Sequence, residues 1–164
     1  MEGADVTRKT YSELAAEAAL KIREIEPWNV PAFLLMHPGV LILDIREPAE
    51  FAAIRIAGSV NVPRGILESS AEWDYAETVP ELVTARDRPV ILVCRSGSRT
   101  ALAAVTLEAM GFRDVQSMKL GIRGWNDSDL PLVDADENLL DGDDAAALID
   151  PPLRPEQRKP KGNM

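Results

Sequence analysis

Hydrophobic residues gather in short segments, separated by stretches in which they recur at helical intervals. The segments that we expect to form strands lie at residues 40–43, 58–62, 89–93 and 115–118. Most of them lack polar alternation, which is typical of short strands buried on both faces. Because the stretches between them have helical spacing, the pattern predicts an α/β fold in which helices cover both faces of a parallel sheet.

The longest helical pattern lies near the N-terminus. Thr10 and Glu13 have the spacing of a capping box, in which two side chains satisfy backbone N–H groups at a helix start. Apolar residues then recur at helical intervals until Pro27, namely Leu14, Ala18, Ile22 and Ile25. This pattern predicts an amphipathic helix of about four turns. We expect further helices over residues 31–36, 48–53, 73–85 and 99–110.

These elements predict one domain with an extension at each end. Residues 31–132 carry the strands and form the expected domain, and residues 1–30 form an amphipathic helical extension. The composition becomes acidic over residues 133–150, where we expect a short helix packed on the domain. Residues 151–164 are rich in proline and basic side chains, so we expect a disordered tail.

Charge and composition argue against several classes of protein. The 27 acidic and 18 basic residues give a net charge of -9, whereas a nucleic-acid surface needs clustered basic side chains. Charged residues interrupt the N-terminal region and no apolar run reaches about 18 residues, so neither secretion nor a membrane span is expected. A single cysteine allows no internal disulfide and no cysteine-rich metal site. We therefore expect a reduced thiol, a cytoplasmic protein and no metal.

The one cysteine, Cys94, follows the expected strand at residues 89–93 and precedes a helical pattern. A strand-to-helix turn directs backbone N–H groups toward an anion, and nearby guanidinium groups add positive charge. Both features favour a thiolate over a thiol. We therefore expect Cys94 to be a nucleophile within an anion-binding loop formed by Arg95, Ser96, Gly97, Ser98 and Arg99.

A second candidate residue, Asp44, ends the expected strand at residues 40–43. The carboxyl ends of parallel strands meet at one edge of a sheet, where ligands bind in open α/β folds. Asp44 should therefore lie near Cys94.

Four segments of the chain resemble, in their order, motifs of the rhodanese family of sulfurtransferases. They are residues 44–51, 58–63, 94–99 and 121–125, and the resemblance covers about residues 31–132. It implies that this domain is catalytic and has a three-layer α/β/α fold with a mostly parallel sheet of about five strands. It also implies that Cys94 takes sulfane sulfur from a small anion such as thiosulfate. The resulting persulfide would pass its outer sulfur to cyanide or a thiol, without a cofactor.

The resemblance also implies supporting roles. Asp44 and Arg46 would shape the floor beneath the loop, with Glu50 as a further ion-pair partner of Arg46. From the residues alone, Asp44 and Arg46 are equally consistent with a structural pair at a strand end. The chain departs from the family where Ile54 and Arg55 replace the usual Gly-His pair, which leaves substrate preference open.

Two other functions stay open as alternatives. The related cell-cycle phosphatases and arsenate reductases have five residues between cysteine and arginine, whereas four separate Cys94 from Arg99. The shorter loop favours sulfur transfer over phosphatase or arsenate reductase activity. The second alternative is a persulfide carrier or interaction module for a protein thiol partner.

The net charge should repel an anionic donor at long range, while Arg95 and Arg99 should attract it locally. From the sequence we expect the arginines to dominate, so that added salt lowers the rate with thiosulfate.

Overall fold

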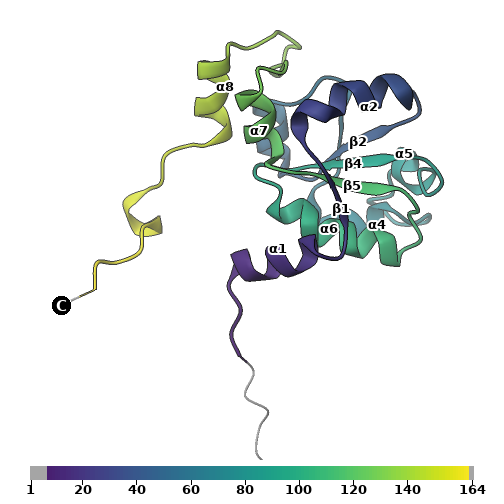
Figure 1. Ribbon diagram of the computed structural model, residues 1–164, viewed down its shortest axis with the longest axis horizontal. Helices are drawn as coiled ribbons and strands as arrows, with labels where there is room; N and C mark the ends of the chain where they lie inside the picture. Colours follow the sequence, from purple (N-terminus) through teal and green to yellow (C-terminus); the bar gives the residue numbers. More distant parts are fainter. Residues whose placement is uncertain (1–6, 163–164) are drawn as a thin grey trace, which may run out of the picture.

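Five parallel strands form the centre of the protein (Figure 1). The structure is a computed structural model and describes residues 7–162. The strands are β1 (Arg23–Ile25), β2 (Leu41–Asp44), β3 (Val60–Asn61), β4 (Val90–Val93) and β5 (Val115–Met118). Their order in the sheet is β1-β5-β4-β2-β3, and every neighbouring pair is parallel. The predicted α/β class and parallel sheet are confirmed.

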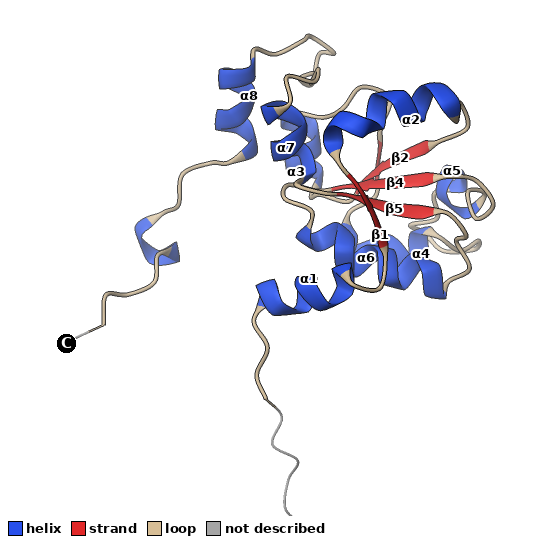
Figure 2. Ribbon diagram, viewed as in Figure 1, coloured by secondary structure: helices blue, strands red, loops and turns tan. Residues whose placement is uncertain are grey.

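Helices cover both faces of this sheet, which gives the three layers that the resemblance implies (Figure 2). One core contains side chains of α4 (Leu67–Ser70), α5 (Pro80–Val83) and α6 (Ser98–Ala109), and α1 (Tyr11–Ala19) packs on α6. The opposite core contains side chains of α2 (Val30–Met36), α7 (Gly121–Asp127) and α8 (Gly142–Ile149). The remaining helical segments are α3 (Pro48–Ala53), η1 (Pro27–Asn29), η2 (Arg64–Ile66) and η3 (Pro155–Gln157).

The register of the two central strands positions the candidate site. All residues of β2 and β4 are buried, and Asp44 lies opposite Val93. Cys94 therefore leaves the sheet directly beside the end of β2. Asp44 and Cys94 thus lie together at the carboxyl edge of the sheet, as expected from the sequence.

The N-terminal prediction is wrong in one respect. The helix starts where expected, with Thr10 accepting a hydrogen bond from the Glu13 amide, but it ends at Ala19. Residues 23–25 form the edge strand β1, which pairs with β5. Ile22 and Ile25 continue the helical spacing by coincidence, and pairing along the exposed edge of β5 outweighs this local pattern. Part of the expected extension therefore belongs to the domain.

The predicted helix over residues 73–85 is also shorter than expected. Turns occupy most of residues 73–79, and α5 begins at Pro80, whose ring suits the first turn of a helix. An additional helix, α4, precedes the turns.

The acidic C-terminal segment contains α8, in agreement with the short helix expected there. Ala145 and Ile149 are buried in the core beside α7. Residues 151–162 are exposed and carry only η3, and their predicted disorder stays a prediction. Residues 1–6 and 163–164, which belong to the predicted extension and tail, lie outside the described residues. Over residues 7–162, no helix is both long and apolar enough to cross a membrane.

Candidate active site

Cys94 lies at the start of a tight loop between β4 and α6. Its side chain is buried, and its Sγ accepts a hydrogen bond from the Gly97 amide at 3.2 Å. Gly97 has a φ of +93°, a left-handed conformation that favours glycine. A Cβ at this position would lie 3.2 Å from the Leu120 amide nitrogen and 3.3 Å from the Met118 carbonyl oxygen. The positive φ and these two tight contacts therefore favour glycine where the loop curls around the sulfur.

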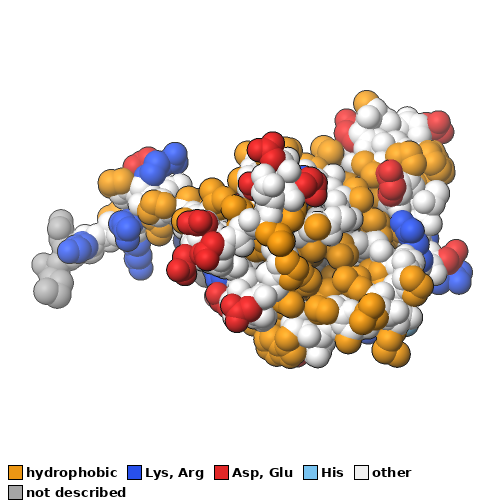
Figure 3. Space-filling model, turned by 90° about the horizontal axis from the view of Figure 1, so that it is seen from above, with side chains coloured by type: hydrophobic (Ala, Val, Ile, Leu, Met, Phe, Trp, Pro, Cys, Tyr) orange, Lys and Arg blue, Asp and Glu red, His pale blue; other side chains and the backbone are white. Residues whose placement is uncertain are grey.

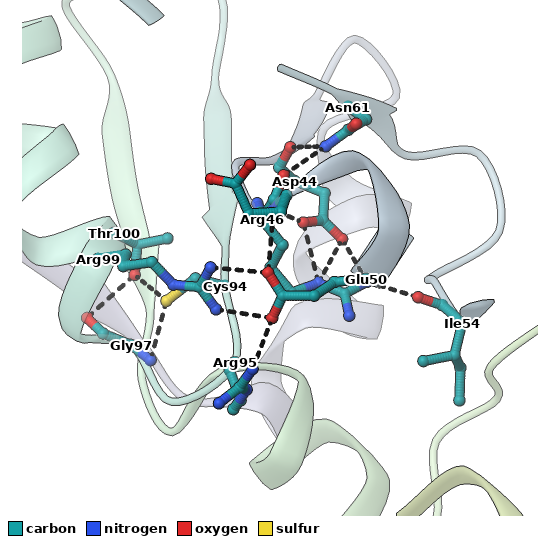
Figure 4. Close-up of polar contacts among 11 residues, drawn as sticks. Asp44, Arg46, Glu50, Ile54, Asn61, Cys94, Arg95, Gly97, Arg99 and Thr100 are labelled. Atoms are coloured by element: carbon teal, nitrogen blue, oxygen red, sulfur yellow. Dashed lines mark hydrogen bonds and ion pairs between the residues drawn. The ribbon is translucent and has the colours of Figure 1, made fainter. Parts of the chain in front are cut away.

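Two hydroxyl groups lie next to the sulfur in a chain of polar contacts, and Figure 4 shows the first of them, on Thr100. Thr100 Oγ1 lies 3.5 Å from Cys94 Sγ and donates to the Gly97 carbonyl at 3.0 Å. Ser117 Oγ in turn donates to Thr100 Oγ1 at 2.7 Å, and both side chains are buried. The Thr100 hydroxyl can therefore accept from a thiol or turn to donate to a thiolate.

The sequence analysis did not identify either of these hydroxyl groups. The available signals were a serine within the buried strand β5 and a threonine directly after the loop arginine. Both are weak, because serine and threonine also occur in strands and helices without a functional role.

Both arginines of the loop bind Glu50 of α3. Arg99 makes a bidentate pair with the carboxylate at 2.9 and 3.0 Å, and Arg95 donates to it at 2.9 Å. Burial would raise the pKa of Glu50. The Arg99 side chain, the Glu47 amide and the Arg95 side chain outweigh burial and lower that pKa from 4.5 to about 2. Glu50 is therefore ionised and ties the loop to α3.

The expected pairing of Glu50 with Arg46 is wrong. Arg46 binds Asp44 instead, with its Nε 3.1 Å from both carboxylate oxygens and its Nη2 2.9 Å from Oδ2. The physical reason is that the buried Asp44 carboxylate and the Ile54 carbonyl hold the Arg46 side chain, while the Glu50 carboxylate faces the arginines of the loop.

Asp44 and Arg46 form a buried pair that holds the turn between β2 and α3. Their side chains are only 1% and 2% exposed. Arg46 also donates to the Ile54 carbonyl, and Asn61 donates to the carbonyls of Asp44 and Arg46 at 3.0 and 2.9 Å. These contacts support the structural reading of the pair, since they fix the position of the helix that carries Glu50.

The start of α7 lies directly against the loop. Ile122 donates its amide to the Cys94 carbonyl at 2.8 Å, and Arg123 donates to the Arg95 carbonyl at 3.1 Å. Gly121 has a φ of +60°, and a Cβ there would lie 2.4 Å from the carbonyl carbon and oxygen of Arg95. This close backbone contact is the physical reason for glycine at the start of the fourth motif.

Ser96 and Ser98 both line a hollow beside the loop. Ser96 is exposed, and Ser98 is the first residue of α6. A hollow of about 280 Å³ on one side of Ser96 is lined also by Trp28, Leu120 and Arg123. A second hollow, of about 290 Å³, lies on the side facing α1.

Ile54 and Arg55, which replace the Gly-His pair usual in the family, contact the C-terminal segment and not the loop. Ile54 is fully buried, and Arg55 pairs with Val133 through two backbone hydrogen bonds of 3.0 and 2.9 Å. The Arg55 side chain lies 5.1 Å above the Phe51 ring and binds Glu137 at 2.6 Å. Arg55 therefore anchors the acidic segment. Among the described residues, no group of three or more His, Cys, Asp or Glu could hold a metal ion.

Comparisons with known proteins agree with this geometry. The profile of the Rhodanese-like domain family matches residues 33–128. The thiosulfate sulfurtransferase GlpE of Pseudomonas fluorescens is 32% identical over 105 residues, which cover 64% of this chain and 85% of GlpE. The protein YibN of Escherichia coli is 35% identical over 100 residues, 61% of this chain and 65% of YibN. The chain thus spans slightly less than two thirds of YibN.

A solved structure from Rhodopseudomonas palustris has a similar fold, with a TM-score of 0.66 and 28% identity. The match covers 78% of this chain and 96% of the chain from Rhodopseudomonas palustris. That protein is described as one of unknown function and a possible tyrosine phosphatase.

Proposed function

The chain belongs to the rhodanese-like family, and from this membership we propose that it moves sulfane sulfur through a persulfide on Cys94. The observation that carries the proposal is the hydrogen bond from the Gly97 amide to Cys94 Sγ, in a loop that also holds two arginines. Backbone N–H groups and positive charge around a sulfur stabilise an anion at that place, such as the outer sulfur of a persulfide. The similarity to a thiosulfate sulfurtransferase supports the same reaction class.

Two displacements make up the proposed reaction. The Cys94 thiolate attacks the outer sulfur of a donor such as thiosulfate, the S–S bond of the donor breaks, and sulfite leaves with the bonding electron pair. An acceptor such as cyanide or a thiol then attacks the outer sulfur of the persulfide and releases the Cys94 thiolate. The loop stabilises the anionic persulfide electrostatically, so no cofactor or external base is required.

The remaining predictions about the site belong to this proposal. Arg95, Ser96, Gly97, Ser98 and Arg99 form the loop that surrounds the transferred sulfur. Glu50 supports the loop by binding the two loop arginines. Asp44 and Arg46 support the helix that carries Glu50. We place the reaction in the cytoplasm, where a lone cysteine stays reduced.

The intact mass of the protein after incubation with thiosulfate tests the proposal. We expect a gain of one sulfur that disappears when cyanide is added. Cys94→Ser should show no gain while unfolding at a temperature close to that of the wild type. The same mass gain in Cys94→Ser, or a wild-type mass that stays unchanged with every sulfane donor tested, would refute the proposal.

A protein thiol is a second candidate acceptor, because apolar side chains flank the loop. Trp28 is 57% exposed and Leu120 is 47% exposed, and both line the hollow beside Ser96. Exposed aromatic and aliphatic side chains beside a reactive group suit contact with another protein. The second-order rates of transfer to small thiols and to a candidate protein acceptor distinguish the two. Equal rates would speak against a dedicated protein partner.

A further inference from the structure

Helix α8 lies beside the two elements that hold the active-site loop. It follows the residues matched by the family profile and packs against α7 and α3 (Figure 1). Ala145 and Ile149 fix it there through their burial, and Asn126 of α7 donates to the Gly142 carbonyl at 2.9 Å. Since α3 carries Glu50 and α7 begins at the loop, the end of α8 is well placed to affect the surroundings of Cys94.

The residue that follows α8, Asp150, neutralises an arginine next to the loop. Arg123 of α7 donates to both Asp150 oxygens, at 2.8 and 2.6 Å. The Arg123 backbone is bonded to the Arg95 carbonyl, and its side chain lines the hollow beside Ser96. The hydrogen bond from Arg123 lowers the pKa of Asp150, burial opposes this, and the charges of Arg123 and Arg95 lower it further. Asp150 is therefore a negative charge at the rim of the loop.

The positive charges on this side of the loop are only partly neutralised. Glu50 binds Arg95 and Arg99, and Asp150 binds Arg123, so two carboxylates oppose three guanidinium groups. Without Asp150, the Arg123 guanidinium would keep only the longer-range charge of Asp127 and would be open to an anion approaching the loop. The resulting gain in electrostatic attraction increases with the negative charge of the sulfur donor.

We propose that α8 sets the donor specificity of Cys94 through Asp150, whose carboxylate occupies Arg123 and so disfavours small dianionic donors relative to singly charged ones. The assignment of donors rests on the proposed function. The physiological donor would then carry at most one negative charge near its sulfane sulfur, as an alkyl or protein persulfide does.

Alkylation of Cys94 tests the charge at the site without any sulfur transfer. Iodoacetate and iodoacetamide react with a thiolate by the same displacement of iodide, but only iodoacetate is an anion. In Asp150→Asn, the ratio of the iodoacetate rate to the iodoacetamide rate should rise about twofold. The matched control is Asp144→Asn, which removes the same charge from an exposed position in the first turn of α8. Its ratio should stay at the wild-type value.

Two sulfane donors of different charge test the specificity. Thiosulfate is a dianion and methanethiosulfonate a monoanion, and Cys94 would attack the outer sulfur of either, with sulfite or methanesulfinate leaving. In Asp150→Asn, kcat/KM should rise about fivefold for thiosulfate and about twofold for methanethiosulfonate. The double variant Arg123→Gln/Asp150→Asn removes both charges and should return the ratio between the donors to near the wild-type value.

Three results would overturn the inference. They are an alkylation ratio unchanged in Asp150→Asn, an equal rise in Asp144→Asn, and equal changes of kcat/KM for both donors. If neither donor forms a persulfide in any variant, the proposed function fails. The alkylation ratio then still decides whether Asp150 controls the charge at Cys94.

Discussion

The Thr100 hydroxyl lies 3.5 Å from Sγ of the candidate nucleophile Cys94. Thr100→Val keeps the shape of the side chain but leaves the buried Ser117 hydroxyl without its acceptor. We expect the free energy of unfolding to fall by about 1–3 kcal/mol, the cost of an unsatisfied buried polar group. Alkylation of Cys94 by iodoacetamide at fixed pH should slow by about fivefold, because the thiolate loses a hydrogen-bond donor.

Two further variants control this prediction. Thr100→Ser keeps the hydroxyl and should retain most of the alkylation rate. Ser117→Ala combined with Thr100→Val removes both partners and should recover part of the lost stability without recovering the rate. Full reactivity in Thr100→Val would mean that the hydroxyl does not act on the sulfur.

Glu50 gives a prediction about stability and pH. Its pKa in the folded protein is about 2, below the ordinary value of 4.5, so its ion pairs stabilise the fold above pH 4.5. This contribution is lost as the pH falls from 4.5 toward 2. At neutral pH, Glu50→Gln should lower the free energy of unfolding by about 2 kcal/mol, less than the full pKa difference implies because water screens part of the carboxylate.

Urea unfolding of the wild type and Glu50→Gln over a pH series measures this contribution. The difference between the two proteins should shrink below pH 4.5 and vanish near pH 2. Glu77→Gln, which removes an exposed carboxylate from a turn, should show no comparable difference. A difference that persists unchanged at low pH would show that Glu50 acts by packing and not by charge.

At the scale of single residues, the sequence predicted the loop but not the partners of Glu50. A cysteine between a strand and a helix, followed by two arginines, was sufficient to place the loop. The pairing of those arginines with Glu50 joins residues more than forty positions apart, and it depends on how α3 lies against the loop. Local spacing carries no information about such a contact. The same holds for Asp150, which reaches the rim of the loop only because α8 packs on α7 and α3.

At the scale of elements, the joint between α7 and the loop depends on the absence of one side chain. Gly121→Ala would place a Cβ 2.4 Å from the carbonyl carbon of Arg95, a backbone atom that cannot move without displacing the loop. We expect a loss of about 3 kcal/mol or more in the free energy of unfolding, because the strained φ and the clash add. The rate of persulfide formation should also fall, since the hydrogen bonds from α7 hold the loop.

Substitutions at two other glycines distinguish the cost of the strained φ from the cost of the clash. Gly111 has a φ of +91° with no atom near a Cβ, so Gly111→Ala should cost about 1 kcal/mol from backbone strain alone. Gly39 has an ordinary φ and open space, and Gly39→Ala should be close to neutral. If Gly121→Ala costs no more than Gly111→Ala, the close contact does not limit the joint.

The elements differ in how far the sequence predicts them. The strands β2 and β4 were evident because every residue of each is buried, which produces a continuous apolar run. The strand β1 was missed because only one of its three residues is buried. It is held by hydrogen bonds to β5 rather than by its own pattern. The other edge strand, β3, also has no buried residue, but it was expected because Val60 and Val62 lie between Gly58 and Pro63.

At the scale of the whole molecule, the ion pairs change the expected effect of salt. The net charge is -9, and acidic side chains lie at several separate places on the face seen in Figure 3. The loop arginines are not free, since Arg95 and Arg99 share Glu50. A dianion approaching from solution therefore meets the net charge of the protein before it meets the local field of the loop. The expectation that the arginines dominate, reached from the sequence, is thus replaced by its opposite.

Added salt should raise the second-order rate of persulfide formation from thiosulfate. Between about 0.02 and 0.2 M sodium chloride the screening length shortens to less than the radius of the protein, and we expect a gain of about two- to threefold. Methanethiosulfonate should show about half this slope on a logarithmic scale, because it carries half the charge. Stopped-flow measurement of sulfite or sulfinate release gives both slopes. A rate that falls with salt would show that the loop attracts donors more strongly than the acidic surface repels them. The gain should also be smaller in Asp150→Asn than in Asp144→Asn, because only Asp150 adds its negative charge beside the loop.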